Sequence, residues 1–248
     1  MRDGGFRVRG KEISRIEGLS DAVFGFAITL LIVSLEVPKT ADEVLHTMRG
    51  FFAFAITFAL LFGVWRTQFT FFRRYGLEDN TTVLLTAVLL FVILFFVFPL
   101  KFVIGAIVER LLAHAGFPDP TAVNIFKEPR AGLLMTIYSV GFAAVFVVFA
   151  LLYRHAYAKR NDLQLNELEE FDTLSTMKVQ ITTAVFGGVL AVVNLVTYLL
   201  PDGAASDRIA MVLALGLAAV LAVLMRGQRR VRVKRRELVS RIRREVEA

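Results

Sequence analysis

The sequence predicts an all-α integral membrane protein with six transmembrane helices. Three observations support this fold class. The 248 residues are 56% hydrophobic and 21% charged, whereas soluble domains are typically about 45–50% apolar and about 25% charged. The apolar residues are gathered into long blocks, without the polar face that a soluble helix shows at every turn. Each block is about long enough to cross a hydrocarbon core roughly 30 Å thick.

Six apolar blocks form the predicted spans. They cover residues 20–37, 50–72, 82–107, 131–153, 179–200 and 209–225. Turn-forming residues such as Pro38 and Pro201 separate them. We expect the first block to be a retained helix and not a signal peptide, because Glu36, Val37 and Pro38 end it and no small-residue cleavage site follows. Two segments outside the spans, 161–172 and 229–248, are candidates for further helices.

Lys and Arg are distributed unequally between the two sides of this predicted topology. The side that carries both termini has 21 of them and the opposite side has seven. The positive-inside rule therefore places both termini in the cytoplasm, as an even number of spans also requires. We predict a multi-pass protein of the plasma membrane (cell inner membrane) with a six-helix membrane domain at 1–228. Residues 229–248 form a basic cytoplasmic tail, which we expect to face anionic lipid headgroups and not nucleic acid.

The sequence offers no set of residues for catalysis or for a metal. It has no cysteine, which excludes disulfides and thiolate metal sites. Its three histidines lie far apart and outside the apolar blocks, where we expect them to be solvated: His46, His114 and His155. There is no phosphate-binding glycine loop and no paired-histidine zinc spacing. We therefore predict a protein that is not an enzyme, with no catalytic residue, cofactor or bound metal.

Polar residues gather at the start of the first span, where Arg15, Glu17, Ser20 and Asp21 precede a long apolar run. Such residues are costly near a membrane and often mark function. A simpler interpretation is that Ser20 and Asp21 cap the helix, because a carboxylate is favoured at the positive end of the helix dipole. The residues by themselves leave both interpretations open.

The stretch from Arg15 to Asp21 resembles the transmembrane protein 175 family of endosomal and lysosomal potassium channels, which has bacterial homologues. That family carries Arg-x-x-x-Phe-Ser-Asp at the start of its first helix. Arg15, Ser20 and Asp21 match this motif, and Leu19 replaces the phenylalanine. Trp65 near the end of the second span and a third span that continues to about Pro99 are also similar. Six spans in about 250 residues fit a bacterial single-repeat member.

The resemblance implies a homotetramer in which four first helices surround a central pore for potassium ions. Matched from Asp21, the constrictions fall on Phe26, Leu30 and Val33, with Thr29 as a polar layer between them. Offsets of four and three residues keep the apolar three on one helix face. Rings of such side chains resist wetting and can gate conduction. The same face would also suit packing against lipid or a neighbouring helix.

Two positions depart from the family pattern. Phe26 stands where bacterial relatives tend to have a smaller aliphatic residue, so its ring could narrow the pore. Trp65 is followed by Arg66, Thr67 and Gln68, where the family often continues into histidines. We therefore expect a different supporting network around Trp65 and Arg66. Arg66 either extends to the cytoplasmic surface or pairs with Asp21 or Glu17.

Two further polar residues have candidate roles. Glu36 would form an acidic ring at the pore mouth of a tetramer, although an exposed carboxylate at a helix end is the simpler interpretation. Asn194, inside the fifth span, is expected to make an interhelical hydrogen bond. Two other protein classes remain open at this point. One is a secondary transporter, which would show matched interruptions in two halves of the chain, and the other is a non-conducting membrane scaffold.

Overall fold

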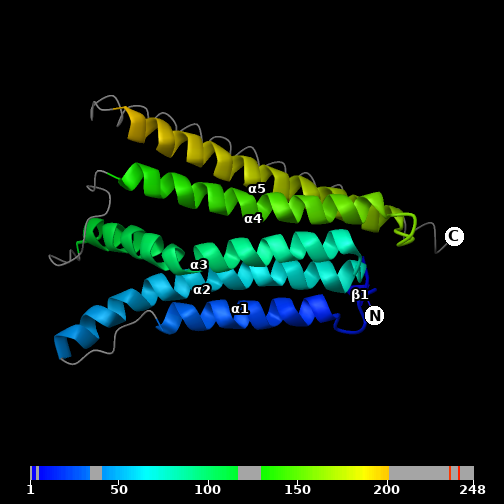
Figure 1. Cartoon of the computed structure of the whole chain (residues 1–248), viewed down its shortest axis with the longest axis horizontal. Helices are drawn as coiled ribbons and strands as arrows, with labels where there is room; N and C mark the ends of the chain where they lie inside the picture. The colour runs from blue at the N-terminus through cyan, green and yellow to red at the C-terminus, as the bar shows by residue number, and fades with distance from the viewer. Residues whose placement is uncertain are drawn as a thin grey trace.

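The computed structural model describes residues 2–3, 6–33, 41–116, 130–200, 235 and 240. Within these residues the chain is helical apart from two short antiparallel strands, which confirms the predicted helical class. The elements are β1 (Arg2–Asp3), β2 (Phe6–Arg7), α1 (Arg15–Val33), α2 (Ala41–Tyr75), α3 (Asn80–His114), α4 (Ala131–Ala158) and α5 (Glu167–Leu199). The helices lie side by side, with α1 against α2 and α3, and α5 against α4 (Figure 1).

Four of the described helices contain segments long and apolar enough to cross a membrane. The segments are Gly50–Tyr75, Asn80–Val97, Ala131–Ala158 and Glu167–Leu199. They correspond to the second, third, fourth and fifth predicted spans. The first predicted span, 20–37, begins inside α1, which is not among the four. The sixth, 209–225, lies outside the described residues, as does the basic tail apart from residues 235 and 240.

Helix α5 begins earlier than the hydropathy pattern predicts. Its first turn is a capping box, in which the Asn166 side chain accepts from the backbone N–H of Glu169 and the Glu169 carboxylate accepts from the N–H of Asn166. Such a reciprocal pair fixes a helix start independently of apolar residues. The candidate helix at 161–172 is formed only in part, because residues 161–164 form turns, 165–166 precede the helix, and 167–172 are the first residues of α5.

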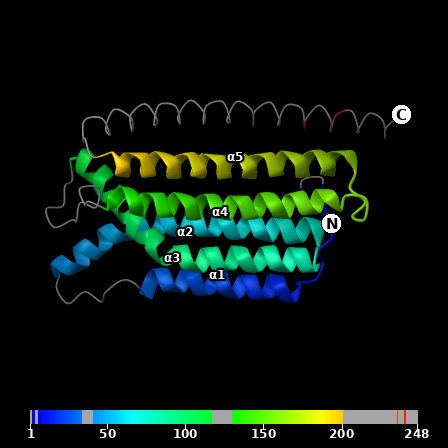
Figure 2. The same ribbon diagram turned by 45° about the horizontal axis from the view of Figure 1, so that its top comes forward.

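Helix α3 extends past both ends of the predicted span 82–107. It includes Pro99 and changes direction along its length (Figure 2). A proline inside a helix removes one backbone hydrogen bond, and its ring crowds the carbonyl of the preceding turn. The apolar pattern therefore predicted one continuous helix correctly but underestimated its length.

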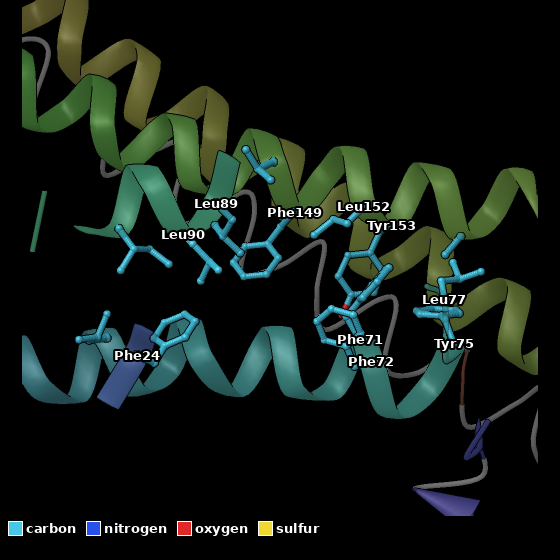
Figure 3. Packing of buried hydrophobic residues seen from close by; sticks show 14 of the residues in the cluster. Phe24, Phe71, Phe72, Tyr75, Leu77, Leu89, Leu90, Phe149, Leu152 and Tyr153 are labelled. Carbon is cyan, nitrogen blue, oxygen red and sulfur yellow. The ribbon is translucent and has the colours of Figure 1, made fainter. Parts of the chain in front are cut away.

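The buried core lies where α2, α3 and α4 meet. Phe71 and Tyr75 of α2 point toward Tyr153 of α4 (Figure 3), with ring centroids 5.5 and 5.9 Å from that of Tyr153. The Tyr75 hydroxyl lies 2.7 Å from the Thr173 hydroxyl of α5, so its polar end is satisfied inside the core. Aromatic pairs of this geometry contribute about 0.5–1.5 kcal/mol beyond their buried area.

The N-terminal segment binds across the ends of α2 and α5. Phe6 is buried edge-on against Tyr75. Arg9 donates from Nη2 to Glu169 Oε2 at 2.7 Å, and the Glu169 side chain is fully buried. The chain passes so close to α2 at Gly10 that an added Cβ would lie 2.4 Å from the Phe72 carbonyl oxygen. Only glycine fits there, so this segment is specifically seated.

The loop between α2 and α3 is tied to α4 by Asp79. Its Oδ1 accepts from the backbone N–H of Thr82 at the start of α3, and its Oδ2 lies 2.7 Å from His155 Nε2 and 2.6 Å from Lys159 Nζ. We expected His155 to be solvated in a loop. It instead lies within α4 and contacts Asp79, because the helix continues past the apolar block that marked its predicted end.

Helices α4 and α5 pack closely along their length. Gly187 lets α5 approach α4, because an added Cβ would lie 2.8 Å from the Phe142 ring and 3.0 Å from Ala143. Asn194 donates to the Ser139 hydroxyl at 3.2 Å. The interhelical hydrogen bond expected of Asn194 is thus confirmed. Small residues and such bonds are the usual means of helix association in a membrane.

The Arg9–Glu169 contact generates a first prediction. Arg9→Ala removes the charged donor from a buried carboxylate and should reduce the free energy of unfolding by on the order of 1–3 kcal/mol. The measurement is the midpoint of thermal unfolding in detergent. Arg154→Ala is the matched control, because Arg154 is an exposed arginine on α4. Equal midpoints for the two variants would contradict this role for Arg9.

Asp79 generates a prediction about pH. Burial alone would raise the pKa of Asp79, but hydrogen bonds from Lys159, from the Thr82 backbone and from His155 outweigh it and hold the pKa below its usual range. A lowered folded-state pKa stabilises the fold above the unfolded value of about 3.9, and this contribution disappears as pH falls further. The midpoint difference between wild type and Asp79→Asn should be constant from neutral pH to about pH 5, then narrow below about pH 4. A difference that widens on acidification would contradict the argument.

Candidate pore helix

Helix α1 begins before the polar motif, not at it. Ser14 immediately precedes the helix, and its hydroxyl oxygen accepts from the backbone N–H of Glu17 at 3.2 Å. The interpretation that Ser20 and Asp21 cap α1 is therefore wrong, because both lie more than a turn inside the helix. Their side chains are available for contacts with other helices.

Ser20 is joined to α2 inside the bundle. Its hydroxyl donates to the Ile16 carbonyl of its own helix at 2.7 Å and accepts from Gln68 Nε2 at 3.0 Å. Both Ser20 and Gln68 are 2% exposed. Within the described part of the chain, Gln68 Oε1 is buried without a hydrogen-bond partner. In the sequence, Gln68 stands out only as a departure from the family pattern, but in the structure it is the hydrogen-bond partner of the motif serine.

Asp21 also contacts α2, about one turn before Gln68. Its Oδ1 accepts from Trp65 Nε1 at 2.8 Å, at an exposed position. Trp65 belongs to a row of aromatic rings along α2, with Phe62 at 5.1 Å and Phe69 at 5.4 Å between centroids. Together, Ser20 and Asp21 set both the axial position and the rotation of α1 against α2.

The other residues of the motif and its network face outward. Arg15 and Arg66 are exposed, and within the described residues neither makes an ion pair. The pairing of Arg66 with Asp21 or Glu17 is thus not formed, and Asp21 bonds to Trp65 instead. Leu19, in place of the family's phenylalanine, is also exposed.

The inner face of α1 has a regular spacing. Its buried residues are Glu17, Ser20, Phe24, Ala27 and Leu31. The steps alternate between three and four residues, which is the spacing of a helix packed at a shallow angle against its neighbours. This face meets α2 and α3, so the opposite face of α1 has no cover within the described chain.

The predicted constriction residues lie on or beside that uncovered face. Phe26 is 58% exposed, and Thr29 is also exposed. Leu30 lies at the edge, partly buried against the core. Val33 is the last residue of α1, and nothing is described of its side chain. Glu36 lies outside the described residues.

Thr29 has a defined hydrogen-bond geometry. Its hydroxyl donates to the Gly25 carbonyl of its own helix at 2.9 Å. A threonine hydroxyl has one proton and two acceptor lone pairs. Because the proton is used within the helix, the oxygen presents only acceptors outward, which is the polarity a cation requires.

Comparisons with known proteins relate this chain to a family of potassium channels. The family described as "Endosomal/lysosomal potassium channel TMEM175" matches residues 15–97, which include α1 and α2. A potassium channel of Marivirga tractuosa is 41% identical over 174 residues, covering 69% of this chain and 70% of that protein. The chain belongs to the TMEM175 family. A potassium channel of Chamaesiphon minutus is 27% identical over 153 residues, covering 58% of this chain and 66% of that protein.

A solved TMEM175 structure extends the similarity to nearly the whole chain. It is a crystal structure of a single-residue variant of the potassium channel MtTMEM175 in complex with a nanobody–MBP fusion protein. It is 33% identical, covers 92% of this chain and 99% of that chain, and gives a TM-score of 0.78. This chain is therefore a multi-pass membrane protein of a potassium-channel family. Within the described residues, no group of acidic or histidine side chains could hold a metal ion.

The Ser20–Gln68 contact generates a prediction specific to this TMEM175 relative. Ser20→Ala leaves the buried Gln68 amide without its acceptor and should cost about 1–3 kcal/mol of stability. Adding Gln68→Met should restore most of the loss, since no buried polar group then remains unpaired. Thermal unfolding in detergent measures both variants.

The matched control is Thr67→Ala, because the Thr67 hydroxyl bonds only within its own helix, to the Gly63 carbonyl. If the double variant were no more stable than Ser20→Ala alone, the two residues would not be coupled in this way.

Proposed function

We propose that the chain is the subunit of a homotetrameric, potassium-favouring cation channel whose pore is lined by α1. The observation that carries this proposal is the uncovered face of α1, on which Phe26 and Thr29 are exposed although the opposite face is firmly packed. Membership of a potassium-channel family and the fold shared with MtTMEM175 support it.

In this proposal the pore has apolar constrictions and no carbonyl filter. The sequence contains no Thr-Val-Gly-Tyr-Gly segment of the kind that replaces the ion's hydration shell with carbonyl oxygens. Four copies of Phe26, Leu30 and Val33 would form apolar rings around the axis. Water and ions cross such a ring only when it is wide enough to stay wet. Phe26 would be the bulkiest of the three and would set the narrowest passage.

Thr29 would supply the polar layer between the rings. Its oxygen presents lone pairs outward, because its proton is donated to Gly25. Four such oxygens would contact a partly dehydrated cation and would repel an anion. Glu36, beyond the end of α1, would raise the local cation concentration at the pore mouth.

The remainder of the chain would support this helix. We propose that residues 1–228 form the channel domain and that 229–248 form a basic cytoplasmic tail that meets anionic lipid. The N-terminal segment, the α2–α3 loop and the α4–α5 turn lie at one end of the bundle (Figure 1). The positive-inside rule assigns that end to the cytoplasm of the plasma membrane (inner membrane). The permeant ion is potassium, and no cofactor or nucleic acid takes part.

The test is ion flux into proteoliposomes that contain the purified protein. We expect wild-type protein to conduct potassium in preference to sodium, and Phe26→Ala to raise the flux and reduce that preference, because a methyl group leaves the ring wider and more easily wetted. Phe91→Ala is the matched control, since Phe91 is 69% exposed on α3 and lies outside the proposed pore. Its flux should equal that of wild type.

The oligomeric state of the same preparation is measured by mass photometry or native mass spectrometry. A monomeric protein without cation flux would overturn the proposal. A saturable, proton-coupled flux would instead indicate a secondary transporter.

A further inference from the structure

Lys101 makes a contact whose effect reaches the proposed pore. It lies on α3, a turn beyond the end of the apolar segment Asn80–Val97. Its Nζ donates to the Leu31 carbonyl oxygen of α1 at 2.9 Å, at a partly buried position. The two residues are 70 positions apart in the sequence, so this bond is a tertiary tie between α3 and α1.

The acceptor lies at a sensitive place on α1. Leu31 lies two residues before Val33, the last residue of α1 that the structure describes, and its carbonyl points toward the negative, C-terminal end of the helix dipole. A lysine is favourable there on electrostatic grounds, and a hydrogen bond from a charged donor is stronger than a neutral one. Leu31 is itself buried on the inner face, so the side chain and the carbonyl of one residue both fix this turn.

The same turn carries two of the proposed constriction residues. Leu30 precedes Leu31 and Val33 follows it by two positions, and Leu30 lies at the edge of the uncovered face. Near its other end, α1 is held by Ser20 and Asp21 through Gln68 and Trp65. Lys101 therefore provides an outer tether, and Phe26, Thr29 and Leu30 lie between it and the Ser20–Asp21 contacts.

We propose that Lys101 is a positioning residue for conduction, which holds the outer turn of α1 so that the constriction keeps a fixed width. The inference rests on the proposed channel function, and it assigns to α3 a direct part in ion discrimination. Discrimination between two cations of similar size requires a constriction of constant dimensions. When the tether is lost, the outer turn samples several widths, and the preference for potassium is averaged out.

The experiment compares potassium and sodium flux in proteoliposomes for wild type, Lys101→Met, Lys101→Arg and Lys101→Gln. Lys101→Met should lower the potassium-to-sodium flux ratio toward that of a non-selective pore, because the outer turn of α1 is no longer held at one width. Lys101→Arg keeps a charged donor and should retain most of the ratio. Lys101→Gln keeps an uncharged donor, so its flux ratio should lie between those of Lys101→Met and Lys101→Arg. Lys178→Met is the matched control, because Lys178 is exposed on α5.

Hydrogen exchange of the α1 backbone is measured on the same variants in detergent. Amides of residues 28–33 should exchange faster in Lys101→Met than in Lys101→Arg, while amides of residues 16–24 should be unchanged. An unaltered ion ratio in Lys101→Met, with wild type conducting, would overturn the inference and leave the proposed channel intact. A wild type without cation flux would overturn the channel, and the exchange data would still show whether Lys101 holds the turn. If Lys101→Met does not assemble, the comparison of Lys101→Gln with Lys101→Arg decides the question.

Discussion

The buried hydrogen bond between Ser20 and Gln68 fixes the helix on which the rest of the proposed mechanism depends. In hydrocarbon, apolar helix faces gain little by meeting one another, because the lipid is equally apolar. Packing alone therefore leaves the axial position of α1 weakly determined. A donor and an acceptor that are both 2% exposed select one position, since a slip of one residue would leave the buried Gln68 amide N–H without its acceptor, at a cost of about 1–3 kcal/mol. Trp65 and Asp21 then fix the rotation of the helix.

This constraint explains how an apolar helix can present one face without neighbours. The inner face of α1 packs in steps of three and four residues against α2 and α3, and polar ties hold it near both ends. Phe26 and Thr29 on the other face are then positioned by the hydrogen bonds of other α1 residues, namely Ser20, Asp21 and Leu31. A pore residue can change in size under this arrangement without dislodging the helix.

The sequence predicted the helical class and four of the spans, because long apolar blocks reflect the thickness of the membrane directly. The sequence did not predict where α1 and α5 begin, because local hydrogen bonds determine the first residue of a helix. The capping box of Asn166 and Glu169 begins α5 ahead of its apolar run, and Ser14 begins α1 ahead of its motif. The motif indicated Ser20 and Asp21 as candidate functional residues. Their partner Gln68 was not predicted, because a pair 48 residues apart becomes visible only once two helices are placed side by side.

The described polar contacts are unevenly distributed along the bundle, and this bears on where motion takes place. One end is held by the Arg9–Glu169 contact, by Asp79 with Lys159, and by Tyr75 with Thr173. These ties join α2, α3, α4 and α5 to the N-terminal segment, so that end behaves as one unit. Toward the other end, the described contacts of α1 include the hydrogen bond from Lys101 to the Leu31 carbonyl. In the proposed channel, a change in pore width at the outer turn of α1 would stretch this charged hydrogen bond and would leave the Tyr75–Tyr153 core packed.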